Sequence, residues 1–251
     1  NEGAINPVSD KEIIDTELQL KDLDTVEKKI QRIEKQARVG DAKAKAELEV
    51  LVKCKAHLEQ GKSIRGLDLS AAELDLIQDS FFLTQKKVLY VANVDEASMH
   101  TGNKYSDALI ASVKEEAAEV IVMNNTIEAQ ISEMEDPDDK QLFMEEYKMT
   151  EPALNRLIRT TYHLLNLQTY FTAGVQEVRA WTFHKGWKAP QCAAVIHTDF
   201  EKGFIKAEVI GYEDYITYKT EAACREAGKL RIEGKEYLVK DGDVMHFRFN
   251  V

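Results

Sequence analysis

An amide and two carboxylates follow an apolar run near the middle of the chain. Residues 88–92 (VLYVA) have the apolar, β-favouring composition of a buried strand, and Asn93-Val94-Asp95-Glu96 comes directly after them. A second apolar run, residues 120–123 (VIVM), is followed in the same way by Asn124-Asn125-Thr126. Amides and carboxylates can pair with the hydrogen-bonding edge of a nucleobase. The two stretches are therefore either plain loops or two halves of a base-binding site.

The elements around these stretches favour the site. Residues 104–118 (KYSDALIASVKEEAA) have a helical pattern and lie between the two predicted strands. A helix between two strands predicts a βαβ unit and hence a parallel sheet. In parallel sheets ligands bind at the loops that follow the carboxyl ends of strands, which is where both stretches fall.

The composition sets limits on the class of protein. The chain has 251 residues, of which 44% are hydrophobic and 31% charged, which is typical of a soluble globular protein with solvated helices. No apolar run approaches the roughly 20 residues that cross a bilayer, and the first residues lack the features of a signal peptide. The three cysteines form no C-x-x-C pair, which argues against a zinc ribbon and favours a reducing, cytoplasmic location.

The net charge of −11 is unevenly distributed. Residues 1–150 hold 19 Lys and Arg against 31 Asp and Glu, whereas residues 151–251 hold 14 against 13. The acidic part should repel a nucleic-acid backbone, so any RNA contact is expected in the C-terminal part.

Two apolar stripes predict a helical hairpin in the first third of the chain. The spacing alternates between three and four residues on both sides of a Val39-Gly40-Asp41 break, at Leu23, Val26, Ile30, Ile33, Ala37, Ala44, Leu48 and Leu51, and Leu58 follows seven residues further on. The first fifteen residues are expected to be a loop that leads into the first helix, with Pro7 and Ser9-Asp10 as start signals. A further helix is predicted over residues 71–84, with Phe81 and Phe82 as core anchors.

Residues 127–163 are expected to be helical and acidic, with breaks near Pro137 and Pro152. Beyond residue 168 the pattern changes to strands. A hairpin around Gly174, a helix near 190–198, a strand over 205–210, a helix over 213–228 and a final hairpin turning at Asp241-Gly242 predict a small α+β roll of β-grasp type.

Basic and aromatic residues alternate on one strand of this roll. Arg179, Trp181 and Phe183 share one face of the predicted strand, and Lys185 and Lys188 follow. Such a face could stack RNA bases and hold phosphates, or it could be one packed face of a β-grasp sheet. The two readings are equally consistent with the pattern.

Other motifs have simpler explanations. Gly61-Lys62-Ser63 resembles the end of a phosphate-binding loop, but Ala56 stands where that loop needs its first glycine. His197, Asp199 and Glu201 have no second ligand cluster at metal-site spacing, so no metal site is predicted.

The chain resembles the YchF (Obg-like) ATPase family, a branch of the P-loop GTPase superfamily. The resemblance is carried by LQLKDLDTVEK, GLDLSAAE, VLYVANVDE, LLNLQTYFTAGVQEVRAWTF, APQCAAVIHTDFEKGFI and EGKEYLVKDGDVMHFRFNV. It implies an α/β P-loop G domain, here partial, with a helical coiled-coil hairpin insertion and a C-terminal β-grasp (TGS) α+β domain. The implied segments are a G-domain remnant and linker (1–15), the hairpin (16–84), the C-terminal half of the G domain (85–165) and TGS (166–251).

The resemblance also implies a function for the opening stretch. Where GTPases carry N-K-x-D, this family carries N-x-x-E, here Asn93 to Glu96, which implies binding of ATP and weaker binding of GTP. By analogy Asn93 braces the base-binding loops, the backbone of Val94 meets the adenine edge, and Glu96 no longer favours guanine. Asn124, Asn125 and Thr126 correspond to the second base-binding loop. The intact protein is expected to hydrolyse ATP with Mg²⁺, and its TGS domain to contact the ribosome or RNA rather than DNA or a membrane.

The phosphate-binding half of that pattern is absent from the sequence. No G-x-x-x-x-G-K-[ST] occurs in the 251 residues, and the Mg²⁺-ligating switch and D-x-x-G segments are also missing. Phosphoryl transfer depends on those groups. We therefore expect a fragment that begins after D-x-x-G and has no catalytic residues of its own. The alternative is a non-enzymatic adaptor that binds ribosome, RNA or protein through its coiled coil and TGS domain.

Overall fold

The structure is a computed structural model that describes residues 5–116, 118–174 and 177–250. The chain divides into two compact units, residues 1–157 and 158–251, and each is described by itself. This division falls within the segment predicted to run from 85 to 165. The four-segment organisation stays a prediction.

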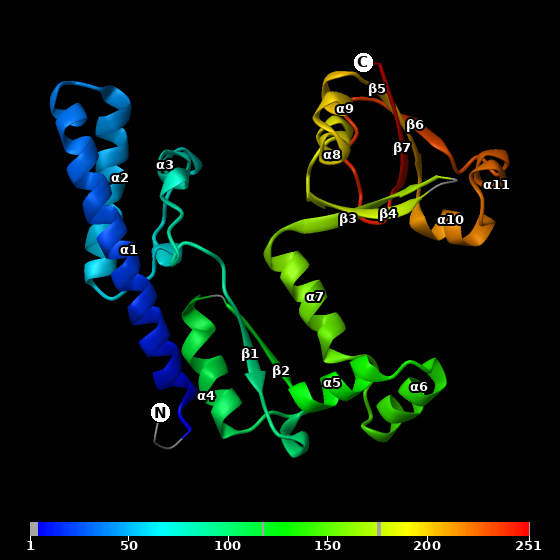
Figure 1. Ribbon diagram of the computed structural model, residues 1–251, viewed down its shortest axis with the longest axis horizontal. Helices are drawn as coiled ribbons and strands as arrows, with labels where there is room; N and C mark the ends of the chain where they lie inside the picture. The colour runs from blue at the N-terminus through cyan, green and yellow to red at the C-terminus, as the bar shows by residue number, and fades with distance from the viewer. Residues whose placement is uncertain (1–4, 117, 175–176, 251) are drawn as a thin grey trace. The chain divides into compact units, whose positions relative to one another are not determined.

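The N-terminal unit combines a helical part with a short parallel sheet (Figure 1). Its elements are α1 (Pro7–Arg38), α2 (Ala42–Glu59), η1 (Ile64–Gly66), α3 (Ala71–Ile77), η2 (Gln78–Ser80), β1 (Leu89–Asn93), η3 (Glu96–Ser98), α4 (Lys104–Val113), η4 (Lys114–Glu116), β2 (Glu119–Met123), α5 (Asn125–Glu133), α6 (Pro137–Glu146) and the beginning of α7 (Ala153–Leu164). Among the described residues, no helix has both the length and the apolar character that a membrane crossing requires.

Helices α1 and α2 lie side by side and are joined by a short turn (Figure 1). The turn uses Gly40, whose φ of 95° suits glycine, and Asp41, whose side chain accepts hydrogen bonds from the first amides of α2. The prediction of a loop over the first fifteen residues was wrong, because α1 already begins at Pro7. Asn6 caps that end by accepting from Ser9 N, and proline is well suited to the first helical position.

The apolar stripes of α1 and α2 meet in one core. Val26, Leu51 and Cys54 are fully buried there together with Ile77 of α3 and Phe82. The prediction that Phe81 is a second anchor was wrong. Its ring is 78% exposed, because the backbone turns at a φ of 50° at this residue and directs only Phe82 inward.

A buried carboxylate joins α1 to the segment that leads into the sheet. Asp22, 2% exposed, accepts from the backbone N–H groups of Leu83 at 2.8 Å and Thr84 at 2.7 Å, and from the Thr84 hydroxyl at 2.7 Å. The Thr84 hydroxyl oxygen in turn accepts from Ile64 N at 3.1 Å. The buried carboxylate and the four donors thereby all have hydrogen-bond partners within the protein.

Strands β1 and β2 pair in parallel, from Leu89 with Glu119 to Asn93 with Met123. Helix α4 makes the crossover and packs Leu109 and Val113 against Ala92. The predicted βαβ unit is confirmed.

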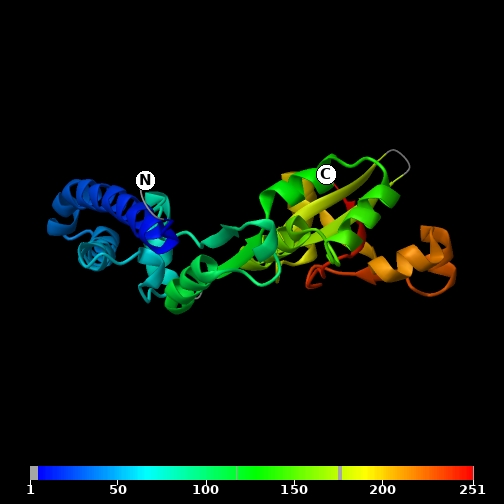
Figure 2. The same cartoon turned by 90° about the horizontal axis from the view of Figure 1, so that it is seen from below.

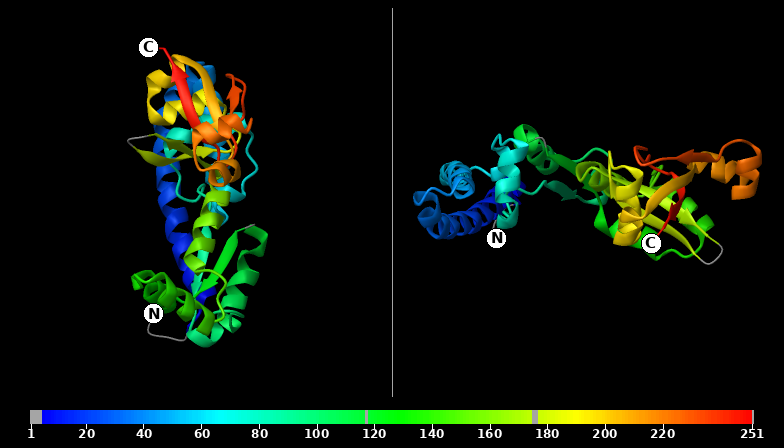
Figure 3. Two further views of the ribbon diagram at one scale, coloured as in Figure 1. Left: turned by 90° about the vertical axis from the view of Figure 1, so that its right-hand side faces the viewer. Right: turned by 90° about the horizontal axis from the view of Figure 1, so that it is seen from above.

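The C-terminal unit contains a five-stranded sheet with helices on both faces. The strands are β3 (Leu167–Ala173), β4 (Val178–His184), β5 (Phe204–Ile210), β6 (Arg231–Glu233) and β7 (Val244–Phe249), in the order β4-β3-β7-β5-β6. Helices α8 (Ala189–Ile196) and α9 (Thr198–Lys202) lie against one face of the sheet (Figure 3). Helices α10 (Tyr212–Tyr218) and α11 (Glu221–Glu226) lie side by side (Figure 2). Strand β3 pairs in parallel with β7, and the remaining pairs are antiparallel.

Two predictions for this unit were wrong. The expected hairpin of residues 236–249 does not form, since Leu238 makes only an isolated bridge with Lys188 and β7 pairs with β3 and β5. The Tyr237 hydroxyl instead donates to the buried Asp243 carboxylate at 2.8 Å. Burial, and after it this hydrogen bond, raises the pKa of Tyr237 to about 12. The single helix expected over 213–228 is divided into α10 and α11 at Lys219, which has a φ of 65°.

Replacing Asp22 by Asn is predicted to destabilise the N-terminal unit by about 3 kcal/mol. The substitution keeps the shape of the side chain but replaces an acceptor oxygen by a donor, and hydrogen bonds to a charged group contribute ~1.5–3 kcal/mol each. Urea unfolding gives the stability, and amide exchange at Leu83 and Thr84 should accelerate. Asp24→Asn is the matched control, because Asp24 is an exposed partner of Lys28 on the same helix. An equal loss in both variants would contradict the assignment.

Candidate functional site

The carboxyl ends of β1 and β2 bring the two predicted loops together. The last residue pair of the parallel register is Asn93 with Met123, so residues 94–96 and 124–126 leave the sheet at the same edge. Figure 1 shows both strands ending beside α5. Parallel strands give this arrangement directly, because their carboxyl ends lie on one edge of the sheet.

Two asparagine side chains connect the loops. The Asn93 Oδ1 atom accepts from Asn125 N at 3.0 Å, and the Asn124 Nδ2 atom donates to Val94 O at 2.7 Å. Asn124 also caps α5, because its Oδ1 accepts from Ile127 N at 2.9 Å. We refer to the set Asn93, Val94, Asn124 and Asn125 as the amide clamp. It fixes the spacing of the loops through side-chain amides.

The amide clamp determines which polar groups are left for a ligand. Val94 is 9% exposed, its N–H donates to Met123 O at 3.0 Å, and its carbonyl already accepts from Asn124. The expected contact of the Val94 backbone with adenine must therefore use the second lone pair of the carbonyl, since the N–H is taken. The Asn93 Nδ2 group has no partner among the described residues, so it is a donor held in a fixed position.

The other predicted base-binding residues lie outside the amide clamp. Glu96 is the exposed first residue of η3 and lines a shallow pocket with His100, Tyr147 and Lys148. Burial raises the pKa of Tyr147, and the negative charge of Glu96 adds to this effect. Thr126 is exposed in the first turn of α5. The structure thus brings four of the predicted residues together by hydrogen bonds and leaves Glu96 and Thr126 at the periphery.

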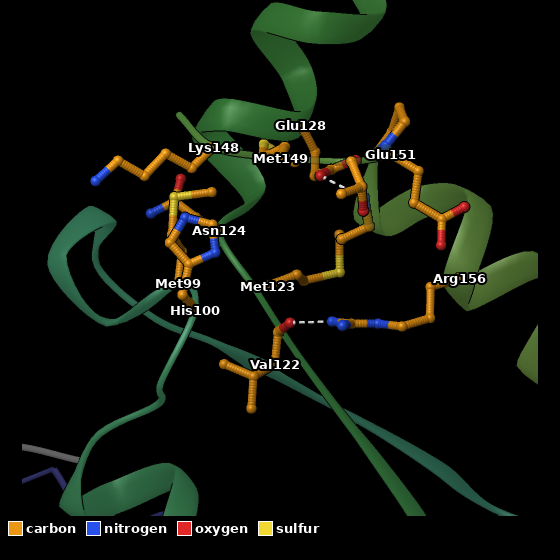
Figure 4. A pocket seen from close by; sticks show the side chains of 13 residues that line it. Met99, His100, Val122, Met123, Asn124, Glu128, Lys148, Met149, Glu151 and Arg156 are labelled. Carbon is orange, nitrogen blue, oxygen red and sulfur yellow. Dashed lines mark hydrogen bonds between the residues drawn. The ribbon is translucent and has the colours of Figure 1, made fainter. Parts of the chain in front are cut away.

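A second pocket adjoins Asn124 (Figure 4). Glu128 of α5 caps α7 there, accepting from Ala153 N at 2.7 Å and Leu154 N at 3.0 Å. Arg156 of α7 donates to Val122 O of β2 at 2.6 Å. The start of α7 is therefore fastened to both elements that carry the second loop. Sequence reasoning missed this contact; Pro152 before an amphipathic helix was its only signal.

No metal site accompanies the clamp. Within residues 5–116, 118–174 and 177–250 no group of three or more His, Cys, Asp or Glu side chains is placed to hold a metal ion. His197 instead caps α9 by accepting from Asp199 N, and Gly61-Lys62-Ser63 forms the turn after α2.

The predicted RNA-binding face of β4 is turned toward the protein core. Phe183 is 1% exposed and packs with Tyr170, while Trp181 is half-buried and donates to the Thr172 hydroxyl at 2.9 Å. The Arg179 guanidinium covers the Trp181 ring at 4.1 Å. Phe183 is therefore part of the packed face that was the alternative reading of this strand, whereas RNA binding through Arg179 and Trp181 stays a prediction.

The two lysines after β4 differ in their surroundings. Lys185 is exposed and has no side-chain partner among the described residues. Lys188 pairs with Glu236 at 2.5 Å.

Comparisons with known proteins agree over nearly the whole chain. A family model named YchF-GTPase_C, described as a protein of unknown function (DUF933), matches residues 167–250. The chain is 53% identical over 249 residues to the ribosome-binding ATPase YchF of Escherichia coli O157:H7, covering 99% of this chain and 68% of that protein. It is 48% identical to the protein of the same name in Bacillus subtilis, with the same coverage.

Relatives with lower sequence identity also match over nearly the whole chain. The chain is 41% identical to Obg-like ATPase 1 of Gallus gallus, covering 99% of this chain and 64% of that protein. The solved structure of the Schizosaccharomyces pombe YchF GTPase matches with a TM-score of 0.85 and 36% identity, over 98% of this chain and 67% of that one.

Replacing Glu128 by Ala is predicted to loosen the start of α7. The substitution removes both acceptors for the Ala153 and Leu154 amides, and loss of a helix cap costs about 0.5–2 kcal/mol. Hydrogen exchange of the first turn of α7 should accelerate roughly tenfold, since 1.4 kcal/mol corresponds to that factor. The control is Glu133→Ala at the exposed end of α5. Unchanged exchange at residues 153–156 in the Glu128 variant would refute the capping role.

Proposed function

The chain belongs to the YchF family, and from that premise we propose that it binds a purine nucleotide at the amide clamp, with ATP preferred over GTP. The observation that carries the proposal is the pair of bonds from Asn125 N to Asn93 and from Asn124 to Val94. They hold two loops at the carboxyl edge of a parallel strand pair, where α/β proteins bind ligands.

The groups left by the clamp suit adenine better than guanine. The Asn93 Nδ2 group donates to a ring nitrogen that both purines have, such as N7. The free lone pair of the Val94 carbonyl accepts from the exocyclic amino group of adenine. Guanine has a carbonyl oxygen at that position, so two acceptors would face each other. The preference thus comes from one backbone oxygen, and Glu96 at the periphery neither favours nor excludes either base.

For the protein to which this chain corresponds, we propose ATP hydrolysis with Mg²⁺. The support is the family and the relatives named as ATPases, of which this chain spans about two thirds. Among residues 5–116, 118–174 and 177–250, no group of three or more His, Cys, Asp or Glu side chains is placed to hold Mg²⁺. Because the 251 residues contain no phosphate-binding loop motif, they supply base binding without phosphoryl transfer.

Ribosome or RNA binding is proposed for the C-terminal unit, with a TGS-type role for the β-grasp sheet, in the cytoplasm. The relatives named as ribosome-binding and the nearly neutral charge of residues 151–251 support it. Helices α1 and α2 would serve as a coiled-coil arm. A second candidate function is that of a non-enzymatic adaptor, which uses only the coiled-coil arm and the β-grasp sheet. The absence of a phosphate-loop motif from the 251 residues favours this candidate.

The purified 251-residue chain is predicted to release no phosphate from ATP or GTP. Hydrolysis depends on backbone amides, a lysine and a metal around the phosphates, and the sequence lacks the corresponding motif. A malachite-green assay measures this. Turnover that scales with protein, survives repurification and falls in the Asn93→Ala variant would show that the chain is itself an enzyme.

Base recognition is predicted to follow the amide clamp. Adenosine should bind more tightly than purine riboside, which lacks the amino group, and guanosine should bind weakest. Asn93→Asp keeps the acceptor for Asn125 N but replaces the donor by a charged acceptor. Adenosine binding should fall about tenfold, since leaving one polar group unmatched costs ~1–3 kcal/mol.

Titration by NMR chemical shifts measures these affinities without a phosphate contribution. The control is Glu96→Gln, which lies outside the clamp and should leave the order unchanged. If Glu96→Gln alters the adenosine-to-guanosine ratio and Asn93→Asp does not, Glu96 is the base reader and the clamp is not.

A further inference from the structure

The sheet of the C-terminal unit has a second face that the predicted RNA surface did not use. Side chains alternate along a strand, and Tyr170 and Phe183 fill the core on the α8 side. The residues between them, including Thr169 and Phe171 of β3 and Thr182 of β4, therefore point to the opposite face. The pairing places Phe171 beside Ala180 and Thr169 beside Thr182.

A groove runs over this opposite face. Its floor is β3, and its walls are the last turns of α7, the first turn of α10 and the turn at Asp241-Gly242. Tyr162 of α7 contacts the sheet through its hydroxyl, 3.1 Å from the Thr182 hydroxyl. Lys185 N donates to Asn166 O at 2.9 Å, which holds the end of α7 beside the end of β4. The groove is thus a fixed feature of residues 158–251.

Two aromatic rings form a platform in the groove. The centroids of Phe171 and Tyr212 are 5.8 Å apart and their planes differ by 34°. Tyr212 is 46% exposed, and the small Ala180 opposite Phe171 leaves space over the ring. Gly242, with a φ of 82°, allows the turn to approach Tyr212, whose Cβ would lie 3.2 Å from a Cβ added at this glycine. An exposed ring such as that of Tyr212 can stack an unpaired base, with the partly buried Phe171 beside it.

Two basic side chains with room for a phosphate line the same groove. Lys185 and His163 are exposed, and neither side chain has an ionic partner in the part of the chain that the structure describes. Two of the acids in the groove are occupied: Asp241 accepts from Thr169 N at 2.8 Å, and Asp214 pairs with Lys229 at 3.1 Å. Glu213 remains at the rim on α10. The charged Lys185 and the imidazole of His163, which can donate a hydrogen bond to a phosphate, therefore lie at the end of the groove formed by α7 and β4.

Resting on the proposed ribosome or RNA binding of this unit, we propose that the groove binds single-stranded RNA. A base stacks on the Phe171–Tyr212 platform, and the phosphates of the strand lie toward Lys185 and His163. A duplex would not fit this arrangement, because its bases are already stacked and paired. Non-specific single-stranded binding with a marked salt dependence is the expected behaviour.

The test uses the 251-residue chain and a fluorescently labelled, unstructured RNA of about ten nucleotides, a length within the usual site sizes of single-strand binders. Anisotropy is measured at several salt concentrations. Tyr212→Ala and Lys185→Gln should each weaken binding about five- to tenfold, and Lys185→Gln should also reduce the salt slope by about 0.7. Lys188→Gln and Arg179→Gln are matched controls that remove one cation outside the groove, and both should bind like the wild type.

The outcomes separate this proposal from the one on which it rests. Wild-type RNA binding that Tyr212→Ala and Lys185→Gln leave unchanged, or that Arg179→Gln weakens equally, overturns the groove and leaves RNA binding by the unit intact. Ribosome binding without RNA binding, weakened by the groove variants, means that the groove takes a protein, which overturns the RNA occupant. Absence of both RNA and ribosome binding overturns the groove and the proposed function together.

Discussion

The parallel pairing of β1 with β2 is the constraint on which the candidate site depends. Parallel strands cannot be joined by a tight turn, so their ends are connected only through the distant crossover helix α4. The loops that leave the sheet need another means of keeping their spacing. Asn93 and Asn124 provide it, since each uses one side-chain atom to satisfy a backbone group of the other loop. The same constraint places β2 and α5 where Arg156 and Glu128 hold the start of α7.

Local patterns in the sequence were sufficient to predict the helices and strands whose residues are spaced by the burial of one face. The three- and four-residue spacing of apolar residues identified α1 and α2, and the two apolar runs identified β1 and β2, because burial of one stripe or one strand dictates those patterns. The pattern could not predict which of two neighbouring apolar residues occupies a single buried position. Phe81 and Phe82 are chemically identical, and only the backbone turn decides which one is buried.

The sequence did not predict which distant segments pair with one another or which side chains they bind. The alternation around Tyr237 resembles a strand, yet Leu238 forms only an isolated bridge with Lys188, and Asp243 holds Tyr237. For the site, the residue types at the strand ends identified Asn93 and Asn124. That the Val94 N–H is already occupied, or that Phe183 points inward, depends on three-dimensional partners that no local spacing records.

The bond between Asp22 and Thr84 has a consequence for the order of folding. It joins residues 62 positions apart, and the entropy lost on closing a loop grows with its length. The turn between α1 and α2 involves only neighbouring residues, so the helical pair can form first. Once it has formed, the open stretch still to be closed is shortened to the residues between the end of α2 and Thr84. Early pairing of α1 with α2 therefore lowers the entropic cost of bringing Thr84 to Asp22.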